Sequence, residues 1–176
     1  MSRSDIDADL KIRLAQLCLD KKNHHSPIGW DSWALYLDPE VTAAIVEKFK
    51  SYVDNTVAGA DYLCAIPTAG WPLAVHLQHV FHKPLISLDL PKGVFRCEKQ
   101  IKKGANILLV DTVIHTGTTL NEAVEDLSRI DGKFLCALAI AFNDLCPGQH
   151  PNLKRLLQQD KVKYLYKFSQ LGPAEV

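Results

Sequence analysis

The stretch ILLVDTVIHTGTTL, residues 107–120, decides which fold the chain is expected to adopt. A run of apolar residues leads directly into one acid, Asp111, and a hydroxyl-rich turn around Gly117 follows. A strand that is apolar at every position is buried on both faces, as in a parallel sheet with helices on each side. A turn that opens a helix after such a strand presents unpaired backbone N–H groups at the positive end of the helix dipole. The stretch therefore predicts a parallel strand that ends at an anion-binding turn.

The residue types in this turn indicate which anion it would bind. Gly117 lets the backbone curl around a phosphate, and the threonines at 116, 118 and 119 supply hydroxyl donors. Asp111 cannot hold the same phosphate, because like charges repel, but it can bind ribose hydroxyls or, through water, a divalent cation. An acid followed by a phosphate-binding turn suggests a sugar phosphate. Neither a Walker A loop nor GxGxxG occurs in the chain, and an ordinary strand–turn–helix with threonines at the cap remains the alternative.

Outward from this strand, apolar runs alternate with helical patterns. Helices are predicted over 71–81 and from about 118 to 130. The alternation predicts an α/β fold with a mostly parallel five-stranded sheet and flanking helices. Ligands bind at the carboxyl ends of the strands in such sheets, where the turns 67–70 and 111–119 both lie. The five predicted strands are YLCAIP (62–67), PLISLDL (84–90), NILLVD (106–111), KFLCALAIAF (133–142) and KVKYLYKF (161–168).

The first 58 residues lack this alternation and are predicted to form helices beside the α/β core of residues 59–176. A first helix is expected from Asp5 to Leu19, and the Asp38–Pro39 pair is a typical helix start. Between them, HHSPIGWDSWALYLD reads as a loop or short strand that covers something apolar. One domain of 176 residues is expected. The apolar faces of the two helices consist of Ile6, Leu10, Leu14 and Leu17, and of Val41, Ile45, Phe49 and Tyr52.

Composition and charge argue against several classes of partner as the main ligand, although a local basic patch is compatible with them. The chain has 20 basic and 20 acidic side chains, so its formal charge is zero, which argues against a nucleic-acid or anionic-membrane surface. No apolar run has the length of a membrane span, and the charged N-terminus does not resemble a signal peptide. The five cysteines are widely spaced and form no CxxC pair. A reducing, cytoplasmic location is expected.

Two stretches in order resemble a known family. ILLV, Asp111 and HTGTT are similar to the 5-phosphoribosyl-1-diphosphate motif of the type I phosphoribosyltransferases. The upstream DYLCAIPTAGWPLAVHL resembles the diphosphate loop of that family, which lies between its first core strand and a helix. SPIGWDSWALYLDPEVTAAIVEKF is similar to the N-terminal hood of the orotate enzymes, so the resemblance favours orotate phosphoribosyltransferase-like members.

The resemblance implies a function and a set of site residues. It implies transfer of ribose 5-phosphate from the activated diphosphate to a nucleobase, in nucleotide synthesis or salvage, with Mg²⁺ as cofactor and a homodimer as the assembly. A pyrimidine or orotate-like base is favoured, and a purine is possible. In this scheme Thr116, Gly117, Thr118 and Thr119 bind the 5′-phosphate, Thr68, Ala69 and Gly70 bind the diphosphate through backbone N–H groups, Asp111 and Thr112 bind the ribose, and Arg96 and Lys99 close over the diphosphate; Asp111 also contacts the metal through water.

The chain departs from the family at three places. Thr112 stands where the motif has its second acid, and the basic interval DLPKGVFRCEKQIKKG, which corresponds to the catalytic loop of the orotate enzymes, is short. Asn143 and Asp144 stand where those enzymes carry an arginine for the orotate carboxylate. These departures favour a second hypothesis, in which the chain is a non-catalytic ligand-binding or regulatory protein.

Histidines and aromatic residues leave further alternatives open. His115 occupies the position of an aspartate near the base in the hypoxanthine–guanine enzymes, so it either contacts the base, in a pH-sensitive way, or faces solvent. His76, His79 and His82 are spaced three apart; an exposed helix face is favoured over a metal site. Trp30, Trp33 and Tyr36 form either a stacking wall for a base or, as favoured here, a small satellite core or dimer contact.

Overall fold

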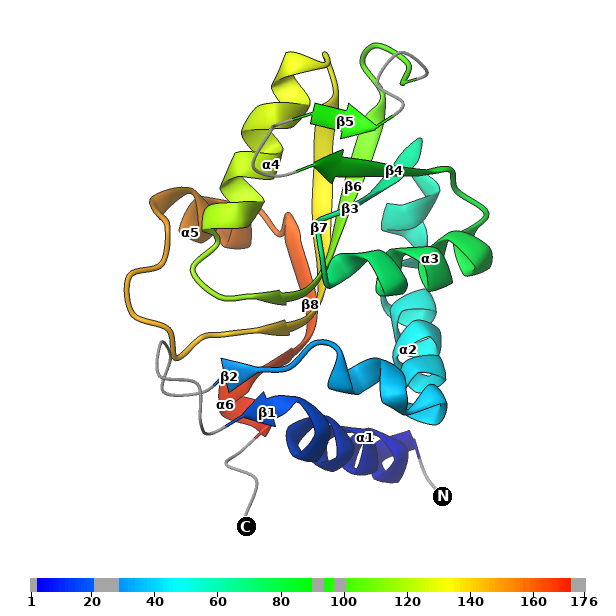
Figure 1. Cartoon of the computed structure of the whole chain (residues 1–176), viewed down its shortest axis with the longest axis vertical. Coiled ribbons are helices and arrows are strands. Elements are labelled where there is room, and N and C mark those ends of the chain that lie inside the picture. The colour runs from blue at the N-terminus through cyan, green and yellow to red at the C-terminus, as the bar shows by residue number, and fades with distance from the viewer. Residues whose placement is uncertain (1–2, 21–28, 90–93, 97–100, 172–176) are drawn as a thin grey trace.

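The computed structural model of the chain describes residues 3–20, 29–89, 94–96 and 101–171. Figure 1 shows a central sheet with helices on both sides and the N-terminal helix beneath it. The part of the chain that is described contains no helix long and apolar enough to cross a membrane. The helices are α1 (Arg3–Cys18), η1 (Ala34–Leu37, a 3₁₀ turn), α2 (Pro39–Ala58), α3 (Gly70–Phe81), α4 (Thr118–Arg129), α5 (Pro151–Gln158) and α6 (Phe168–Leu171); the strands are β1 (Leu19–Asp20), β2 (Gly29–Trp30), β3 (Tyr62–Ala65), β4 (Leu85–Asp89), β5 (Val94–Arg96), β6 (Asn106–Ile114), β7 (Lys133–Phe142) and β8 (Val162–Lys167).

The main sheet confirms the predicted mostly parallel arrangement. Its strand order is β5-β4-β3-β6-β7-β8, and the pairs from β4 to β8 are all parallel. These five strands match the five predicted from the apolar runs, but β6 does not end at Asp111 as predicted: it continues to Ile114, so Asp111 lies within the strand. The sheet also has a sixth strand that the sequence did not indicate, because β5 pairs antiparallel with β4. This short edge strand forms part of the interval that was compared with a catalytic loop.

Each face of the sheet is buried by its own set of helices. On one face, Leu108 and Val110 of β6 pack in a hydrophobic cluster with residues of α1, α2 and α3. On the other, Ile107 and Leu109 belong to a second cluster with residues of α4 and α5. Because neighbouring residues of a strand point to opposite faces, the uninterrupted apolar run of β6 supplies both clusters. The sheet is thus the middle of three layers, as Figure 1 shows.

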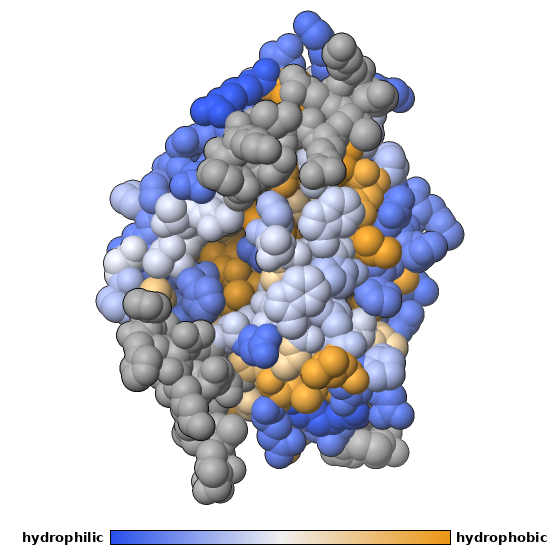
Figure 2. Space-filling model, in the orientation of Figure 1, coloured by the Kyte–Doolittle hydropathy of each residue, from blue (hydrophilic) through white to orange (hydrophobic). Residues whose placement is uncertain are grey.

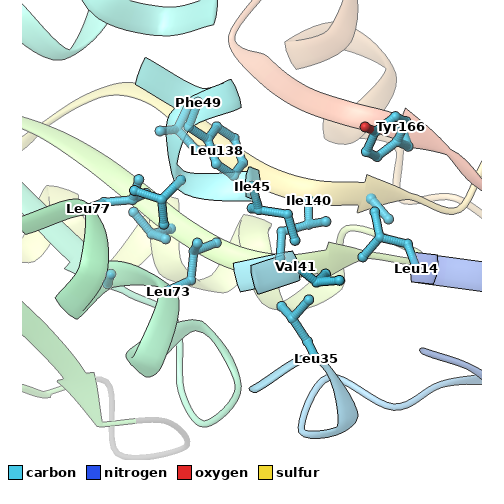
Figure 3. Close-up of a cluster of buried hydrophobic side chains, with 14 of the residues drawn as sticks. Leu14, Leu35, Val41, Ile45, Phe49, Leu73, Leu77, Leu138, Ile140 and Tyr166 are labelled. Atoms are coloured by element: carbon cyan, nitrogen blue, oxygen red, sulfur yellow. The ribbon is translucent and has the colours of Figure 1, made fainter. Parts of the chain in front are cut away.

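The N-terminal helices cover one end of the first cluster. Asp38 caps α2 by accepting the N–H groups of Glu40 and Val41, and Pro39 occupies the first turn, as predicted. Figure 3 shows side chains from α1, η1, α2, α3 and the sheet meeting in one core. The side chains that the structure describes on the predicted apolar faces of α1 and α2 point into this core. Leu10, Leu14, Val41, Ile45 and Phe49 are buried and Leu17 is half-buried, whereas the side chains of Ile6 and Tyr52 lie outside the described ones.

A charged cluster ties α1 to the rest of the chain. The Asp7 carboxylate accepts hydrogen bonds from Lys48 of α2 and, at 2.8 Å, from the hydroxyl of Tyr166 in β8, and pairs with Lys11 at 3.1 Å. Burial opposes its charge, but these donors outweigh burial and lower the pKa of Asp7 to about 2. The cluster thereby holds the N-terminal helix against both α2 and the sheet.

Candidate functional site

The two loops that the sequence singled out lie side by side at the carboxyl ends of β3 and β6. The N–H of Ile66 donates to the carbonyl of Val110 at 2.9 Å, and Gly70 begins α3 against the end of β6. A Cβ at Gly70 would lie 2.5 Å from the carbonyl oxygen of Val110 and 3.2 Å from the Cα of Asp111. Only glycine permits this approach. The predicted diphosphate loop, Thr68 to Gly70, is therefore adjacent to the predicted ribose-binding acid.

The predicted phosphate turn surrounds a small cavity of about 80 Å³. Gly117 takes the left-handed conformation, with φ 82° and ψ 7°, and forms the N-cap of α4 without a capping side chain. Its missing side chain also leaves room for Leu153 of α5, which would lie 2.7 Å from a Cβ there. Figure 2 shows a hollow at mid-height on this face of the molecule. The residues that line the cavity are Asp111, Val113, Ile114, His115, Thr116, Gly117, Thr118, Thr119 and Leu120.

The hydroxyls of the turn are ordered by contacts with one another. The Oγ1 atoms of Thr116 and Thr118 are 3.0 Å apart, and Thr116 Oγ1 accepts the N–H of Thr118 at 3.3 Å. Thr118 and Thr119 are exposed to solvent, so their hydroxyls and the first turn of α4 are accessible from outside. A helix N-terminus with exposed hydroxyls can bind a phosphate group.

Asp111 is the carboxylate of this cavity. The side chain is half-buried, and its Oδ1 accepts the N–H of Thr112 at 2.7 Å. Burial raises the pKa of Asp111 to about 7, although the hydrogen bonds from the N–H groups of Thr112 and Val113 act in the opposite direction. A carboxylate that is poorly solvated in this way is available to bind hydroxyl groups or a hydrated cation.

Thr112 is not among the residues that line the cavity. Its side chain has no exposed surface, and its hydroxyl lies 2.6 Å from that of Ser32, which is 8% exposed. The structure therefore joins Thr112 to the segment before η1 and does not bring its side chain beside Asp111. Thr112, which stands at the position of the second acid of the motif, therefore has a structural hydrogen-bond partner in Ser32.

His115 is neither free in solvent nor isolated. It is half-buried, its Nδ1 lies 3.0 Å from Nδ2 of Asn143, and its ring meets Phe168 edge-on with the centroids 5.6 Å apart. Burial lowers the pKa of His115. Asn143 directly follows β7 and Phe168 begins α6, so residues from distant parts of the chain meet at this histidine.

The aromatic residues near the N-terminus have different environments. Trp30 stacks on Phe168 with the centroids 5.6 Å apart, and its Nε1 is the one buried side-chain polar atom that lacks a hydrogen bond among the described residues. Trp33 is 56% exposed and meets Tyr36 edge-on. The Tyr36 hydroxyl donates to the carbonyl of Ala69 at 3.0 Å, so the N-terminal segment contacts the diphosphate loop directly.

The remaining candidate residues lie away from this cavity or outside the description. Arg96 lies in β5, but its side chain is outside the described ones, as is all of Lys99. His76, His79 and His82 are exposed on or just after α3, and the described residues contain no cluster of three or more possible metal ligands. A groove of about 350 Å³ between α2 and α3 is lined in part by His76 and His79.

Sequence reasoning missed two residues of the site. Ser32 lies 80 positions from Thr112 of β6, which it contacts, and Phe168 lies 53 positions from His115. Ser32 stands in an irregular segment, and Phe168 follows the last strand, so no local pattern distinguishes either residue. Their position depends on the packing of distant segments, which periodicity does not encode.

Comparisons with known proteins agree with this architecture. No protein-family model matches the chain. The chain is 22% identical over 132 residues to an orotate phosphoribosyltransferase of Sulfurimonas denitrificans; the match covers 74% of the chain and 65% of that enzyme. It is 24% identical over 157 residues to an adenine phosphoribosyltransferase of Borreliella afzelii, with 79% of the chain and 85% of that enzyme covered. A bifunctional protein PyrR of Streptococcus pyogenes is 30% identical over 115 residues, with 57% of the chain and 62% of that protein covered.

Solved structures show the same fold. An orotate phosphoribosyltransferase of Aeropyrum pernix superposes with a TM-score of 0.72 at 18% identity, covering 94% of the chain and 96% of that protein. An adenine phosphoribosyltransferase of Leishmania donovani gives a TM-score of 0.74 at 13% identity, covering 93% and 81%. The chain therefore has the fold of the type I phosphoribosyltransferases, as its two linked motifs predicted, and it is similar in sequence to orotate and adenine phosphoribosyltransferases.

Proposed function

We propose that the chain transfers ribose 5-phosphate from 5-phosphoribosyl 1-diphosphate to a nitrogen of a nucleobase. The observation that carries this proposal is the meeting of three features at one edge of the sheet. Asp111 lies in β6 shortly before the strand ends at Ile114, the first turn of α4 lines a small cavity beside it, and Gly70 brings the Thr68–Gly70 loop against Val110 and Asp111. Together they offer separate places for a phosphate, a sugar and a diphosphate.

The phosphate turn binds the 5′-phosphate in this proposal. The hydroxyls of Thr116, Thr118 and Thr119 and the backbone N–H groups of the first turn of α4 are its donors, and the helix dipole adds a partial positive charge. Gly117 keeps the N-cap free of a side chain that would compete for these donors. The cavity is small, so it suits a phosphate group and leaves the sugar and the base outside it.

Asp111 binds the ribose hydroxyls. Its burial favours the protonated acid, and hydroxyl donors from a bound sugar would favour the carboxylate instead. When the diphosphate leaves, positive charge develops on the ribose ring, and a nearby carboxylate stabilises it. Thr112 adds no second charge, so Asp111 provides this stabilisation without a neighbouring acid.

Magnesium fits the site as an ion held mainly by the substrate. Mg²⁺ is commonly bound through one or two carboxylates together with substrate phosphates and water. Asp111 is the one carboxylate among the residues that line the cavity, and it would contact such an ion through water. When bound, the ion neutralises charge on the diphosphate leaving group.

The diphosphate would be bound opposite the sugar. Backbone N–H groups of the Thr68–Gly70 loop are the proposed donors, and Tyr36 holds the carbonyl of Ala69 and thereby the loop. In the structure the N–H of Gly70 donates to the carbonyl of Ile66 at 3.2 Å, so Thr68 and Ala69 are the donors left to the ligand. Arg96 and Lys99 are proposed to close over the diphosphate as cationic partners. We further propose a cytoplasmic homodimer, for which sedimentation of the purified chain is the direct measurement.

Diphosphate release tests the proposal. The chain is incubated with 5-phosphoribosyl 1-diphosphate, Mg²⁺ and, in turn, orotate, uracil, adenine and hypoxanthine. Release that requires one base, and that Asp111→Asn lowers while Ser128→Ala at the exposed far end of α4 does not, would support transfer. If none of the four bases gives diphosphate release above the rate measured without protein, the proposal is refuted.

A non-catalytic binding protein is the second candidate function. Thr112 favours it, because a threonine stands at the place of the second acid of the family motif and its side chain is buried against Ser32. This candidate predicts that 5-phosphoribosyl 1-diphosphate raises the melting temperature, as any ligand of the folded state does, without diphosphate release for any base. Turnover with one of the bases would exclude it.

A further inference from the structure

His115 and Asn143 follow the ends of two neighbouring parallel strands. Ile114 of β6 pairs with Phe142 of β7, and the N–H of Asn143 donates to the carbonyl of Ile114 at 2.8 Å. The residues directly after this register pair therefore lie side by side. Their side chains meet at 3.0 Å, between Nδ1 of His115 and Nδ2 of Asn143.

The orientation of the Asn143 amide is set by a second hydrogen bond. Its Oδ1 accepts the backbone N–H of Leu145 at 3.1 Å, so the other end of the amide, Nδ2, must face the histidine. The side chain is buried, with Asn143 only 1% exposed, which makes exchange of these two roles costly. An amide nitrogen can donate but not accept. Nδ1 of His115 must therefore be the acceptor.

A histidine that accepts at Nδ1 carries its proton on Nε2. The neutral ring has one donor and one acceptor, and the partner of one nitrogen decides the state of the other. A protonated ring would turn Nδ1 into a donor that faces the amide donor of Asn143. Burial, which lowers the pKa of His115, favours the neutral ring as well. Phe168 packs edge-on against the ring and holds its orientation.

The charged groups on the surrounding elements do not compete for this histidine. Asp111 lies on the same strand and accepts the N–H of Thr112. The Asp144 carboxylate accepts the N–H and, at 2.5 Å, the hydroxyl of Ser169. The side chain that contacts Nδ1 of His115 is the amide of Asn143 and not a carboxylate.

We propose that Asn143 fixes His115 as the Nε2–H tautomer, and that this N–H is a hydrogen-bond donor that selects the acceptor nucleobase. The inference rests on the proposed function and names its substrate class. The base presents an unprotonated acceptor, a carbonyl oxygen or a ring nitrogen, to His115. The histidine is a specificity residue and does not take a proton from the base. The one ring nitrogen that could accept a proton, Nδ1, already accepts the hydrogen bond from Asn143.

The same geometry disfavours a carboxylated base. Neither Asn143 nor Asp144 supplies a positive charge at the end of β7. Despite partial burial, the pKa of Asp144 is lowered by the hydrogen bonds from Ser169 and by the nearby charge of Lys167, which pairs in register with Phe142, so the positive charge of Lys167 is offset by this carboxylate. A neutral His115 adds a donor but no charge. Uncharged oxo- and aza-bases are therefore expected to bind more tightly than orotate.

The tautomer can be measured without any ligand. Long-range ¹H–¹⁵N spectra of the ligand-free chain, with His115→Gln to assign the signals, should show a neutral ring protonated at Nε2 at about pH 7. Asn143→Asp keeps the acceptor for Leu145 but places a carboxylate oxygen against Nδ1. It should move the proton to Nδ1 and raise the pKa of His115. A wild-type ring protonated at Nδ1, or an unchanged tautomer in Asn143→Asp, would overturn the inference.

Base binding separates this inference from the proposed function. Titration calorimetry of uracil, hypoxanthine, adenine and orotate is carried out on the chain with 5-phosphoribosyl 1-diphosphate and Mg²⁺. His115→Leu should weaken the preferred base by about tenfold or more, as expected for one lost hydrogen bond, and His115→Gln, which keeps an N–H donor, should recover part of that loss. Unchanged base affinity in His115→Leu with intact diphosphate-sugar binding would refute the inference alone. Absence of any 5-phosphoribosyl 1-diphosphate binding would instead refute the proposed function, and the spectra would still decide the tautomer.

Discussion

Removal of the Ser32–Thr112 contact is expected to destabilise the chain in a non-additive way. The two hydroxyls are 2.6 Å apart, and neither side chain is exposed by more than 8%. Ser32→Ala leaves the hydroxyl of Thr112 buried without this partner, and Thr112→Val does the same to Ser32. A buried polar group that loses its partner costs about 1–3 kcal/mol, whereas replacing both partners by apolar groups costs much less.

The size of the expected loss in unfolding free energy follows from the costs of removing one hydroxyl or both. Each single variant should lower the free energy of unfolding by about 1–2 kcal/mol, and the double variant should lose less than the sum by about 1 kcal/mol. For a chain of 176 residues, each kcal/mol corresponds to a shift of about 2–4 °C in melting temperature. Because Thr112 directly follows Asp111, the contact also anchors the strand end that carries the proposed ribose-binding acid.

Urea unfolding of the four proteins without ligand measures the cycle. Equal m-values would show that the same surface is exposed in each case. Ser51→Ala, at an exposed position of α2, serves as the control and should change stability by less than about 0.5 kcal/mol. If the losses of the two single variants add to within about 0.5 kcal/mol in the double variant, the two hydroxyls do not interact and the reasoning fails.

Three further predictions follow from single sites. Thr112→Asp should destabilise the chain more at pH 7 than at about pH 4, because at pH 7 the new carboxylate would have to ionise in a fully buried position beside Ser32. Equal melting temperatures for this variant and the wild type at both pH values would contradict this prediction. Gly117→Ala should cost about 2 kcal/mol more than Gly148→Ala in urea unfolding, since both glycines have positive φ but only Gly117 would meet Leu153; equal costs would show that α5 yields freely. The pKa of Asp111 is higher in the folded than in the unfolded state, so its ionisation costs stability progressively as the pH rises from about 4 to about 7. Asp111→Asn should therefore raise the melting temperature at about pH 8, by the equivalent of up to about 4 kcal/mol, and leave it unchanged near pH 4; a uniform shift at both pH values would argue against a raised pKa.

Much of the fold follows from local patterns in the sequence. The five predicted runs became the five parallel strands. The central strands β6 and β7 are largely apolar because both of their faces are buried, whereas the edge strand β8 contains lysines and is only partly buried. The Asp38–Pro39 pair began α2, and the turn at Gly117 began α4. The edge strand β5 was not indicated, since it is three residues long and lies in a basic interval without alternation.

The candidate site divides in the same way between local and distant information. The sequence by itself determined the strand, the turn and the order of Asp111 and the threonines after it, because these depend on neighbours along the chain. Only the tertiary structure decided that Thr112 points to Ser32 and that Asn143 fixes the hydrogen bond of His115. Each of these pairs joins residues far apart in sequence, and hydrogen-bond partners of this kind are set by how the layers pack, which no local pattern encodes.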